Sequence, residues 1–372
     1  MAKILFISGH APTNQYPQAG QKISLQHLNG YAQSGADVDV VVVANQAEIA
    51  AAKDLSTQFS GHLYTYPLST VKKVISCLRH FKAPLKFSSR LNEETARKIR
   101  HLLTMSEYDT VHFEYSHAAV YLEHVKSQIS PKQTRIIISI HDVVFQSFLR
   151  KAQQNFLLGI ESNRLFHYEK ALYSQADELW VLSPKDRNIL TSLFSINSNK
   201  ILVVPPLLGN FVKHVKRNPE KFESKSMLFW AAMNRPENEQ AVLAFVKNCF
   251  HQLIQKNSDF KLYIVGANPS KRIMSLANKQ IVVTGFVEDP VPYFEKVEIG
   301  IVPLLTGAGI KLKTLEMLAA GLPVISTTVG AEGVETVDQS LFISDDFDDW
   351  VNAIETGLEN FIPRTKPLET IT

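Results

Sequence analysis

Short and almost uninterrupted apolar runs restrict this chain more than any other feature of its sequence. The clearest example is residues 38–44, which are valine or alanine except for Asp39. Runs of this kind form strands that are buried on both faces, as in a parallel sheet covered by helices. Similar runs recur along the chain, and helical stretches separate several of them. This alternation predicts a doubly wound α/β architecture.

The alternation occurs twice, once in each half of the chain. The first series predicts strands at residues 3–8, 38–44, 109–113, 135–140, 178–182 and 201–204, and a helix at 23–33. The second predicts strands at residues 226–231, 261–265, 281–284, 299–302 and 323–327, and helices at 238–255 and 310–320. We therefore expect two Rossmann-like α/β domains that face a cleft. Their expected limits are residues 1–205 and 226–360, with an interdomain connection at 206–225 and an irregular tail at 361–372.

Composition excludes several other kinds of protein. The 39 Lys and Arg residues nearly balance the 36 Asp and Glu residues, so the charge does not predict a nucleic-acid partner. Only two cysteines occur, Cys77 and Cys249, which excludes a disulfide scaffold and indicates a reducing compartment. The first ten residues lack the apolar stretch of a signal peptide, and no apolar run reaches the roughly 18 residues of a membrane span. We expect a cytoplasmic protein.

A glycine loop in the second half is the most informative segment for chemistry. Gly307 and Gly309 precede the helix expected at residues 310–320, so free N–H groups and the helix dipole favour an anion there. Lys311 and Lys313 fall in the first turn of that helix, where a cation opposes the dipole unless an anion lies beside it. The pattern predicts a diphosphate site, and a solvated lysine pair is the alternative. The expected site residues are Gly307, Ala308, Gly309, Ile310, Lys311 and Lys313.

Glu316 is the single carboxylate of the same, otherwise apolar helix. It lies within two turns of the glycine loop, where it could accept hydrogen bonds from vicinal hydroxyls such as those of a ribose. The alternative is an ordinary surface glutamate, which is common on helices.

The segment around this helix resembles the donor-site signature of family 4 retaining glycosyltransferases, which have the GT-B fold. In that signature a Glu, seven residues and a second Glu precede a small-residue turn and a Pro-Val strand. Glu316 matches the second Glu, and the sequence AAGLPV at residues 319–324 matches the turn and the strand after it. Ala308 stands where the family has the first Glu, which commonly contacts the transferred sugar.

Weaker matches occur in the family's order. Residues 17–21, including Gly20, resemble its entry segment, and residues 176–183 resemble a strand late in its first domain. Residues 284–289 resemble its nucleobase-binding strand end, so the resemblance implies that Val287 and Asp289 contact the base. The family usually holds the diphosphate with an Arg and a Lys, and those positions are Ala232 and about Asn238 here. We expect Arg235, Lys311 and Lys313 to replace that pair.

Polar residues follow two strands of the first half. His141 ends the strand expected at residues 135–140, and the resemblance implies that it contacts the donor sugar. We assign His141 and Lys311 to catalysis. Glu114 and His117 follow the preceding strand and are expected on the acceptor side. Together with His112 they could be read as metal ligands, but they lack a defined ligand spacing, so we expect no metal site.

The resemblance implies transfer of a hexose-like unit from a nucleotide diphosphate sugar to a glycan or lipid-linked acceptor. It also implies retention, no metal and no cofactor, since the nucleotide sugar is a substrate. Such a reaction belongs to cell-surface polysaccharide or glycolipid assembly. One alternative is a sugar-nucleotide epimerase of the same fold. Another is an inactive nucleotide-binding partner subunit, suggested by Ala308, Ala232 and Asn238.

Residues 71–90 suggest a further partner. This segment has six Lys or Arg residues, no acidic residue, and apolar residues between the basic ones. The pattern suits an anionic membrane surface, such as the inner face of the plasma membrane. A solvated basic loop is the alternative.

Overall fold

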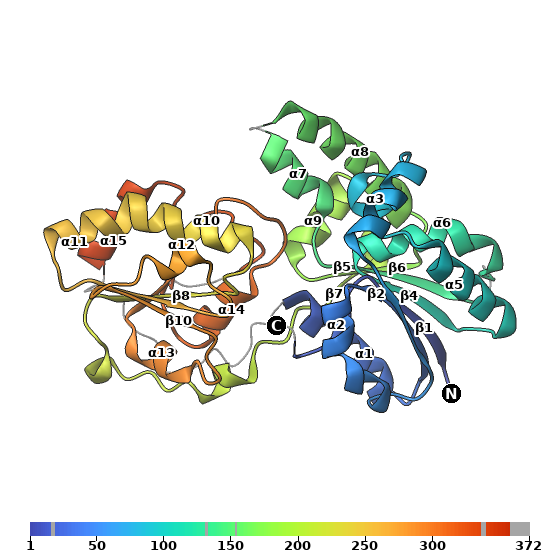
Figure 1. Cartoon of the computed structure of the whole chain (residues 1–372), viewed down its shortest axis with the longest axis horizontal. Helices are drawn as coiled ribbons and strands as arrows, with labels where there is room; N and C mark the ends of the chain where they lie inside the picture. Colours follow the sequence, from blue (N-terminus) through green and yellow to red (C-terminus); the bar gives the residue numbers. More distant parts are fainter. Residues whose placement is uncertain (16–18, 131–132, 153–154, 336–339, 358–372) are drawn as a thin grey trace. The chain divides into compact units, whose positions relative to one another are not determined.

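The computed structural model describes residues 1–15, 19–130, 133–152, 155–335 and 340–357, and the tail expected at 361–372 lies outside them (Figure 1). The chain forms two compact units, Met1–Leu207 and Leu208–Thr372. Each unit contains one parallel sheet with helices packed against it. The expected fold class, two Rossmann-like α/β domains, is therefore confirmed. The expected cleft concerns the placement of one unit relative to the other and stays a prediction.

The first unit has a seven-stranded sheet in the order β3-β2-β1-β4-β5-β6-β7, and every adjacent pair is parallel. Its strands are β1 (Lys3–Ser8), β2 (Asp37–Ala44), β3 (Leu63–Pro67), β4 (Thr110–Glu114), β5 (Arg135–Ile140), β6 (Glu178–Val181) and β7 (Ile201–Val203). The strand order reverses between β1 and β4, which makes that pair the switch point of the sheet.

The helices of the first unit connect and cover these strands. They are α1 (Ala19–Gln33), α2 (Gln46–Ala51), α3 (Thr70–Arg79), α4 (Leu85–Ser88), α5 (Glu93–Met105), α6 (Leu122–Val125), α7 (Val144–Ala152), α8 (Phe156–Tyr173) and α9 (Pro184–Ser192). Helix α1 begins four residues before the expected start at residue 23. Gly20 therefore lies in the first turn of a helix, where the sequence had suggested a loop.

The second unit has a six-stranded sheet in the order β10-β9-β8-β11-β12-β13, also parallel throughout. Its strands are β8 (Ser226–Trp230), β9 (Lys261–Val265), β10 (Ile281–Gly285), β11 (Ile299–Val302), β12 (Val324–Ser326) and β13 (Leu341–Ile343). Here the order reverses between β8 and β11. The carboxyl ends of β8 and β11 thus form the corresponding switch point.

The helices of the second unit lie on both sides of its sheet (Figure 1). They are α10 (Pro236–Phe245), α11 (His251–Lys256), α12 (Lys271–Met274), α13 (Val291–Lys296), α14 (Leu312–Ala319) and α15 (Phe347–Gly357). The helix expected at 238–255 corresponds to α10 and α11. A π-helical turn at Val246–Phe250 joins these two helices. None of the helices in the described parts of the chain is long and apolar enough to cross a membrane.

The segment expected to connect the domains, residues 206–225, packs largely on the second unit. Val212 and Val215 belong to that unit's apolar core. The buried guanidinium of Arg217 donates to the backbone carbonyls of Val297 (2.8 Å) and Glu298 (3.1 Å). Burial lowers the pKa of Arg217 to about 10. The boundary between the units falls at residues 207 and 208, because two valines and one arginine of this Pro- and Lys-rich segment are buried in the second unit.

Candidate functional site

The predicted site residues fall largely at the two switch points. Open parallel sheets bind ligands at the carboxyl ends of their strands, where the strand order reverses. In the second unit the glycine loop follows β11, and Arg235 follows β8. In the first unit Glu114 ends β4 and His141 follows β5, the next strand of the sheet. The predicted residues therefore occupy the same topological position in each sheet.

The glycine loop of the second unit has a backbone that only glycine adopts readily. Gly307 has φ 133° and Gly309 has φ 71°, both in the positive region that disfavours other residues. Lys311 takes the N-cap position of α14 and donates to the carbonyl of Ala308 at 3.1 Å. Its ammonium also lies 3.5 Å from a carboxylate oxygen of Glu332. Lys311 therefore stabilises the loop itself, so its position does not require a bound anion, contrary to the argument from the helix dipole.

Lys313 reaches from α14 toward the loop after β8. Its ammonium donates to Asn238 Oδ1 at 2.5 Å, and Asn238 Nδ2 donates to the carbonyl of Ala232 at 2.7 Å. These are the two positions at which the resemblance placed a cationic pair. Burial, together with the nearby charges of Arg235 and Lys311, lowers the pKa of Lys313 to about 7. An anion bound here would stabilise the charged form of Lys313.

Arg235 supplies the third cation of this edge. It immediately precedes α10 and is half exposed, and its guanidinium pairs with Glu237 at 2.6 Å. The charges of Arg235 and Lys311 both act on Lys313, and the expectation that these three residues replace the family's cationic pair stays a prediction. We call these three residues the basic corner. Within it, Lys311 holds the loop, Lys313 donates to Asn238, and the guanidinium of Arg235 is half exposed.

Glu316 is buried, so it is not the surface glutamate of the alternative. Its Oε2 accepts a hydrogen bond from Trp230 Nε1 at 2.9 Å, and its Oε1 accepts one from the Gly209 N–H at 3.1 Å. The carboxylate thus ties α14 to the end of β8 and to the segment that precedes it. The ribose contact of Glu316 remains a prediction. A bound ribose would share the carboxylate with the N–H groups of Trp230 and Gly209 or replace them.

Val287 and Asp289 follow β10 at the same carboxyl edge of the sheet. Strands β9 and β8 lie between them and β11. Val287 is half-buried, whereas Asp289 is exposed and its Oδ1 accepts the N–H of Val291, the first residue of α13, at 3.0 Å. The predicted base contacts of both residues stay predictions, and Asp289 has this local structural role as well.

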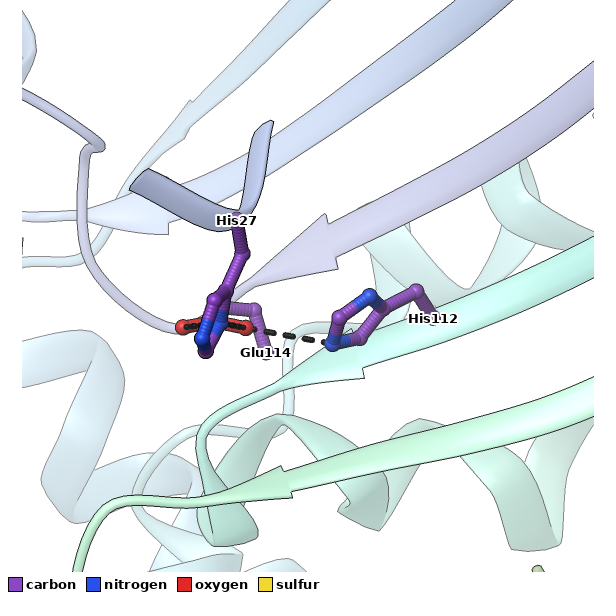
Figure 2. A group of neighbouring side chains, drawn as sticks. All are labelled: His27, His112 and Glu114. Carbon is purple, nitrogen blue, oxygen red and sulfur yellow. Dashed lines mark hydrogen bonds and ion pairs between the residues drawn. The ribbon is translucent and has the colours of Figure 1, made fainter. Parts of the chain in front are cut away.

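In the first unit, three histidines surround the buried carboxylate of Glu114. His141 Nε2 lies 2.6 Å from Oε1, and His27 Nδ1 and His112 Nε2 lie 2.9 Å and 3.1 Å from Oε2. Figure 2 shows how His27, from α1, and His112, from β4, approach the carboxylate from different elements. Burial alone would raise the pKa of Glu114, but His27 and His141 outweigh it and hold the pKa well below the ordinary value.

His27, His112 and Glu114 are also the residue types of a transition-metal site. Their ligand atoms all lie within 4.8 Å of one another. Sequence spacing could not reveal this group, because His27 is 85 positions from His112. However, each facing nitrogen is already at hydrogen-bond distance from Glu114, and His112 Nδ1 lies 2.9 Å from the Tyr31 hydroxyl. We therefore interpret the group as a hydrogen-bonded cluster.

Tyr115, which the sequence did not single out, has an unusual backbone. Its φ of 77° lies in the positive region, where a bulky residue costs on the order of 1–3 kcal/mol. Its ring packs on that of His141 with centroids 4.0 Å apart. A Cβ at Gly20 would lie 3.0 Å from the Tyr115 hydroxyl and 3.5 Å from His141 Nδ1. The structure thus brings the predicted residues Gly20 and His141 together, with Tyr115 between them.

A second polar group borders this one. His117 is buried after β4, and burial, with the charge of Arg90, holds its pKa well below the ordinary value. His10, after β1, lies 2.9 Å from Glu48 and 3.0 Å from the Arg90 guanidinium. His117 is therefore a neutral polar group. Its predicted acceptor-side role stays a prediction, and His10, Glu48 and Arg90 were not anticipated from the sequence.

Comparisons with known proteins agree with this architecture. Residues 23–207 match the family model "Glycosyltransferase Family 4", and residues 224–360 match "Glycosyl transferases group 1". An uncharacterized 44.6 kDa protein in the cps region of Klebsiella pneumoniae is 23% identical over 352 residues, 90% of this chain and 85% of the relative.

Two solved structures illustrate the similarity of fold. Anabaena Alr3699/HepE in complex with UDP and glucose has a TM-score of 0.61 at 12% identity, covering 97% of this chain and 90% of its own. WaaG, a glycosyltransferase involved in lipopolysaccharide biosynthesis, has a TM-score of 0.56 at 12% identity, covering 96% and 90%. At these identities the likeness establishes the fold, which is GT-B.

Proposed function

This chain belongs to the group 1 and family 4 glycosyltransferases, and from that premise we propose that it moves a sugar from a nucleotide diphosphate sugar to a hydroxyl of a glycan or lipid-linked acceptor. The transfer retains the anomeric configuration and requires neither a metal ion nor a bound cofactor. We place the reaction in cell-surface polysaccharide or glycolipid assembly, which the cps-region relative supports.

The basic corner is the observation that carries this proposal. Arg235 and Lys313 lie beside the glycine loop and the starts of α10 and α14, where N–H groups also favour an anion. The departing nucleotide diphosphate gains negative charge during transfer, and preorganised cations stabilise that charge. Lys311 holds the loop in the required shape, and Glu316 holds the ribose. The leaving phosphate takes the proton of the acceptor hydroxyl, as the family resemblance implies.

A donor screen tests the proposal. UDP-, GDP-, ADP- and CDP-sugars are added to the full chain, and the melting temperature is measured, since a ligand of the native state raises it. We expect one nucleotide to raise it, and we expect UDP to be that nucleotide because Alr3699/HepE binds UDP. Release of nucleotide diphosphate is then measured with and without a candidate acceptor glycan or lipid.

The outcomes separate the alternatives. Acceptor-dependent release identifies a transferase. Conversion of the donor sugar without any acceptor identifies an epimerase. Donor binding without turnover in any acceptor mixture identifies the inactive subunit, and the absence of any nucleotide effect on the melting temperature contradicts the proposal as a whole.

We also propose that the first unit docks on an anionic membrane surface through residues 71–90. Helix α3 exposes Val71 and Leu78, which are 67% and 73% accessible, and the exposed Phe81 follows it. The N-terminal turns of α8 extend this apolar surface, since Arg164 of α8 donates to the carbonyl of Phe81 at 2.6 Å. The exposed residues of α8 are Phe156, Leu157 and Ile160. Basic side chains border an apolar patch, which is the pattern of interfacial binding.

Liposome flotation tests the docking surface. Reversing the charge of Lys72 and Lys82 should abolish flotation with vesicles that contain phosphatidylserine, and Leu78→Ser with Phe81→Ser should weaken it. The matched control reverses Lys271 and Arg272, which are exposed on α12 of the second unit. Flotation that survives the first pair of changes, or that the control pair abolishes equally, contradicts the assignment.

A further inference from the structure

Helix α3 has a buried side as well as the exposed side that we assign to membrane docking. Ser76 is buried on α3, and its hydroxyl lies 2.7 Å from the carbonyls of both Ser88 and Leu91. Lys73 lies about one turn before Ser76 on the same side of the helix. Arg90 lies between Ser88 and Leu91, and both Arg90 and Lys73 are half-buried. The packing of α3 thus turns one lysine and one arginine of the basic segment toward the first unit.

The guanidinium of Arg90 is held by two neutral acceptors at the carboxyl end of β1. Its Nη1 donates to the carbonyl of Gly9 at 2.9 Å, and its Nη2 donates to His10 Nε2 at 3.0 Å. In the described part of the chain, Arg90 forms no ion pair with a carboxylate. A guanidinium has five N–H groups, so Arg90 has further donors for an additional acceptor. Its fork is therefore oriented, while no direct contact neutralises its charge.

His10 connects Arg90 to the buried carboxylate of Glu48. Because a guanidinium can only donate, His10 Nε2 accepts, and the proton of the neutral ring lies on Nδ1, which faces Glu48 at 2.9 Å. Burial and the charge of Arg90 lower the pKa of His10 to about 4, so the ring is neutral near pH 7. The carboxylate of Glu48 also accepts from the side chain of Asn45 and from the Ala11 N–H. Glu48 thus orients Arg90 through a neutral ring and does not pair with it.

Further positive charge acts at the same place. Burial and the charge of Arg90 lower the pKa of Lys73, and Lys73 forms no ion pair among the described residues. The charges of Arg90 and Lys86 both act on His117, whose ring centroid lies 5.3 Å from that of His10. His117 Nε2 is buried, and no described residue is its hydrogen-bond partner. Positive charge therefore exceeds negative charge around Arg90.

We propose that Arg90 and Lys73 bind a phosphate group of the acceptor, with His117 at the edge of the site. Glu48 and His10 are the positioning residues that orient Arg90. The identification of the ligand as the acceptor rests on the proposed function, because the proposed site for the donor diphosphate lies in the second unit. The binding of a phosphate group does not rest on it.

A phosphate group suits these residues better than an uncharged hydroxyl of a glycan does. A guanidinium fork binds phosphate through two parallel hydrogen bonds, and a neighbouring ammonium adds a point charge. A bound anion also offsets the repulsion between Arg90 and Lys73. The site lies at the switch point of the sheet, since His10 follows β1 and His117 follows β4.

The exposed side of α3 favours a lipid as the carrier of that phosphate. Val71 and Leu78 lie on the side of the helix opposite to Lys73 and are largely exposed. A lipid phosphate at the membrane surface would therefore be close to both sides of α3, its chain on the apolar side and its phosphate near Lys73. A soluble sugar phosphate offers the same group without the chain, and the probes below separate the two sources.

Isothermal titration calorimetry with inorganic diphosphate and with geranyl diphosphate tests the site. The full chain is first saturated with the nucleotide found in the donor screen, or used alone if the screen finds none. Arg90→Gln and Lys73→Gln should each weaken the binding of both probes about tenfold, through loss of a hydrogen bond to a charged group. Arg97→Gln is the matched control, since Arg97 is exposed on α5, and it should leave the affinity within twofold. Tighter binding of geranyl diphosphate identifies a lipid source, and equal binding of both probes identifies a soluble phosphate.

Histidine spectra locate the site without any variant of Arg90. The chain is labelled with ¹⁵N-histidine, long-range ¹H–¹⁵N spectra are recorded near pH 8, and His10 and His117 are identified by the signals lost in His10→Gln and His117→Gln. We expect the proton of His10 on Nδ1. Inorganic diphosphate should shift the signals of both rings and leave that of His62, exposed just before β3, unchanged. A His10 ring protonated on Nε2, or signals that do not respond to diphosphate, overturns the proposal.

Glu48→Gln tests the positioning of Arg90. If Glu48 acted only through its charge, its loss would tighten the binding of an anion. Because it orients Arg90 through His10, we expect Glu48→Gln to weaken the binding of inorganic diphosphate about fivefold and to give a mixture of His10 tautomers. Glu48→Asp should recover part of both. Tighter binding in Glu48→Gln contradicts the positioning role.

Three further results decide between the explanations. Unchanged affinity in both Arg90→Gln and Lys73→Gln removes the site. Arg90→Gln should keep the flotation with phosphatidylserine vesicles, and loss of flotation would instead assign Arg90 to the membrane surface. If both probes bind as expected but no sugar is transferred to any acceptor, the phosphate site stands and the proposed function fails.

Discussion

The two switch points occupy the same topological position but differ in their chemistry. That of the second unit consists of a glycine loop, two helix starts and the basic corner formed by Arg235, Lys311 and Lys313. That of the first unit consists of three imidazole rings around one buried carboxylate, Glu114. The first arrangement gathers cations, whereas the second has a buried carboxylate at its centre. One fold used twice can thus present different chemistry at the same place in its sheet.

The largest expected effect concerns stability, and it should appear at only one of the two sites. Glu114→Ala leaves three buried imidazoles without their common acceptor and should lower the free energy of unfolding of the first unit by about 3–5 kcal/mol. Lys313→Met removes a charge that burial already disfavours, so it should cost little. Hydrogen exchange of peptides from β4 and α14 measures the two separately. Equal losses of unfolding free energy in both variants would contradict this difference between the sites.

The next effect concerns the affinity for nucleotide. Lys313→Ala should weaken the binding of UDP by about 100-fold, the usual range for a hydrogen bond to a charged group. His141→Ala should leave that affinity within twofold, because His141 lies in the first unit and the proposed diphosphate site is in the second. Isothermal titration calorimetry with UDP gives both values. If His141→Ala weakens UDP binding as much as Lys313→Ala does, the assignment of UDP binding to the second unit is wrong.

Glu316→Ala should weaken the binding of the nucleotide sugar by about tenfold, through the loss of one or two hydrogen bonds to the ribose. The same change also frees Trp230, whose indole N–H donates to Glu316. Trp230→Phe is therefore the control, because it removes that contact and keeps the carboxylate. An affinity that falls equally in both variants would show that Glu316 acts by holding Trp230.

The smallest effect is a dependence on pH. The pKa of Lys313 lies near 7 in the folded chain, and a bound diphosphate raises it, so binding takes up a proton above pH 7. The affinity for UDP should fall roughly fivefold between pH 7 and pH 8. Without ligand, Lys313 keeps its proton to a higher pH in the unfolded chain than in the folded chain. Above pH 7, Lys313 therefore makes the free energy of unfolding rise with pH. An affinity that is flat over this range, or that also falls in Lys313→Met, would exclude Lys313 as the cause.

The interior of the fold could be predicted from the sequence because buried parallel strands are continuous apolar runs. The edge strands β3 and β13 escaped prediction, since their residues are half-exposed and form no such run. The composition of residues 206–225 is that of a linker and gives no sign that Arg217 and two valines are buried in the second unit.

The candidate site was predictable only where its residues are close in sequence. The glycine loop and Glu316 lie within one short segment, so their grouping could be inferred directly. His27 joins Glu114 only through the packing of α1 on the sheet, and no spacing rule connects them. The positive φ of Tyr115 depends on its surroundings, and a tyrosine gives no sign of it in a sequence.

The anchoring of Arg217 has a practical consequence for dissecting the chain. A fragment meant to carry the second unit alone should begin at Leu208, where that unit begins. Starting at Ser226, the first residue of β8, would remove Val212 and Val215 from the core and leave the carbonyls of Val297 and Glu298 without their donor. The longer fragment should be the one that purifies as a monodisperse species and still responds to UDP.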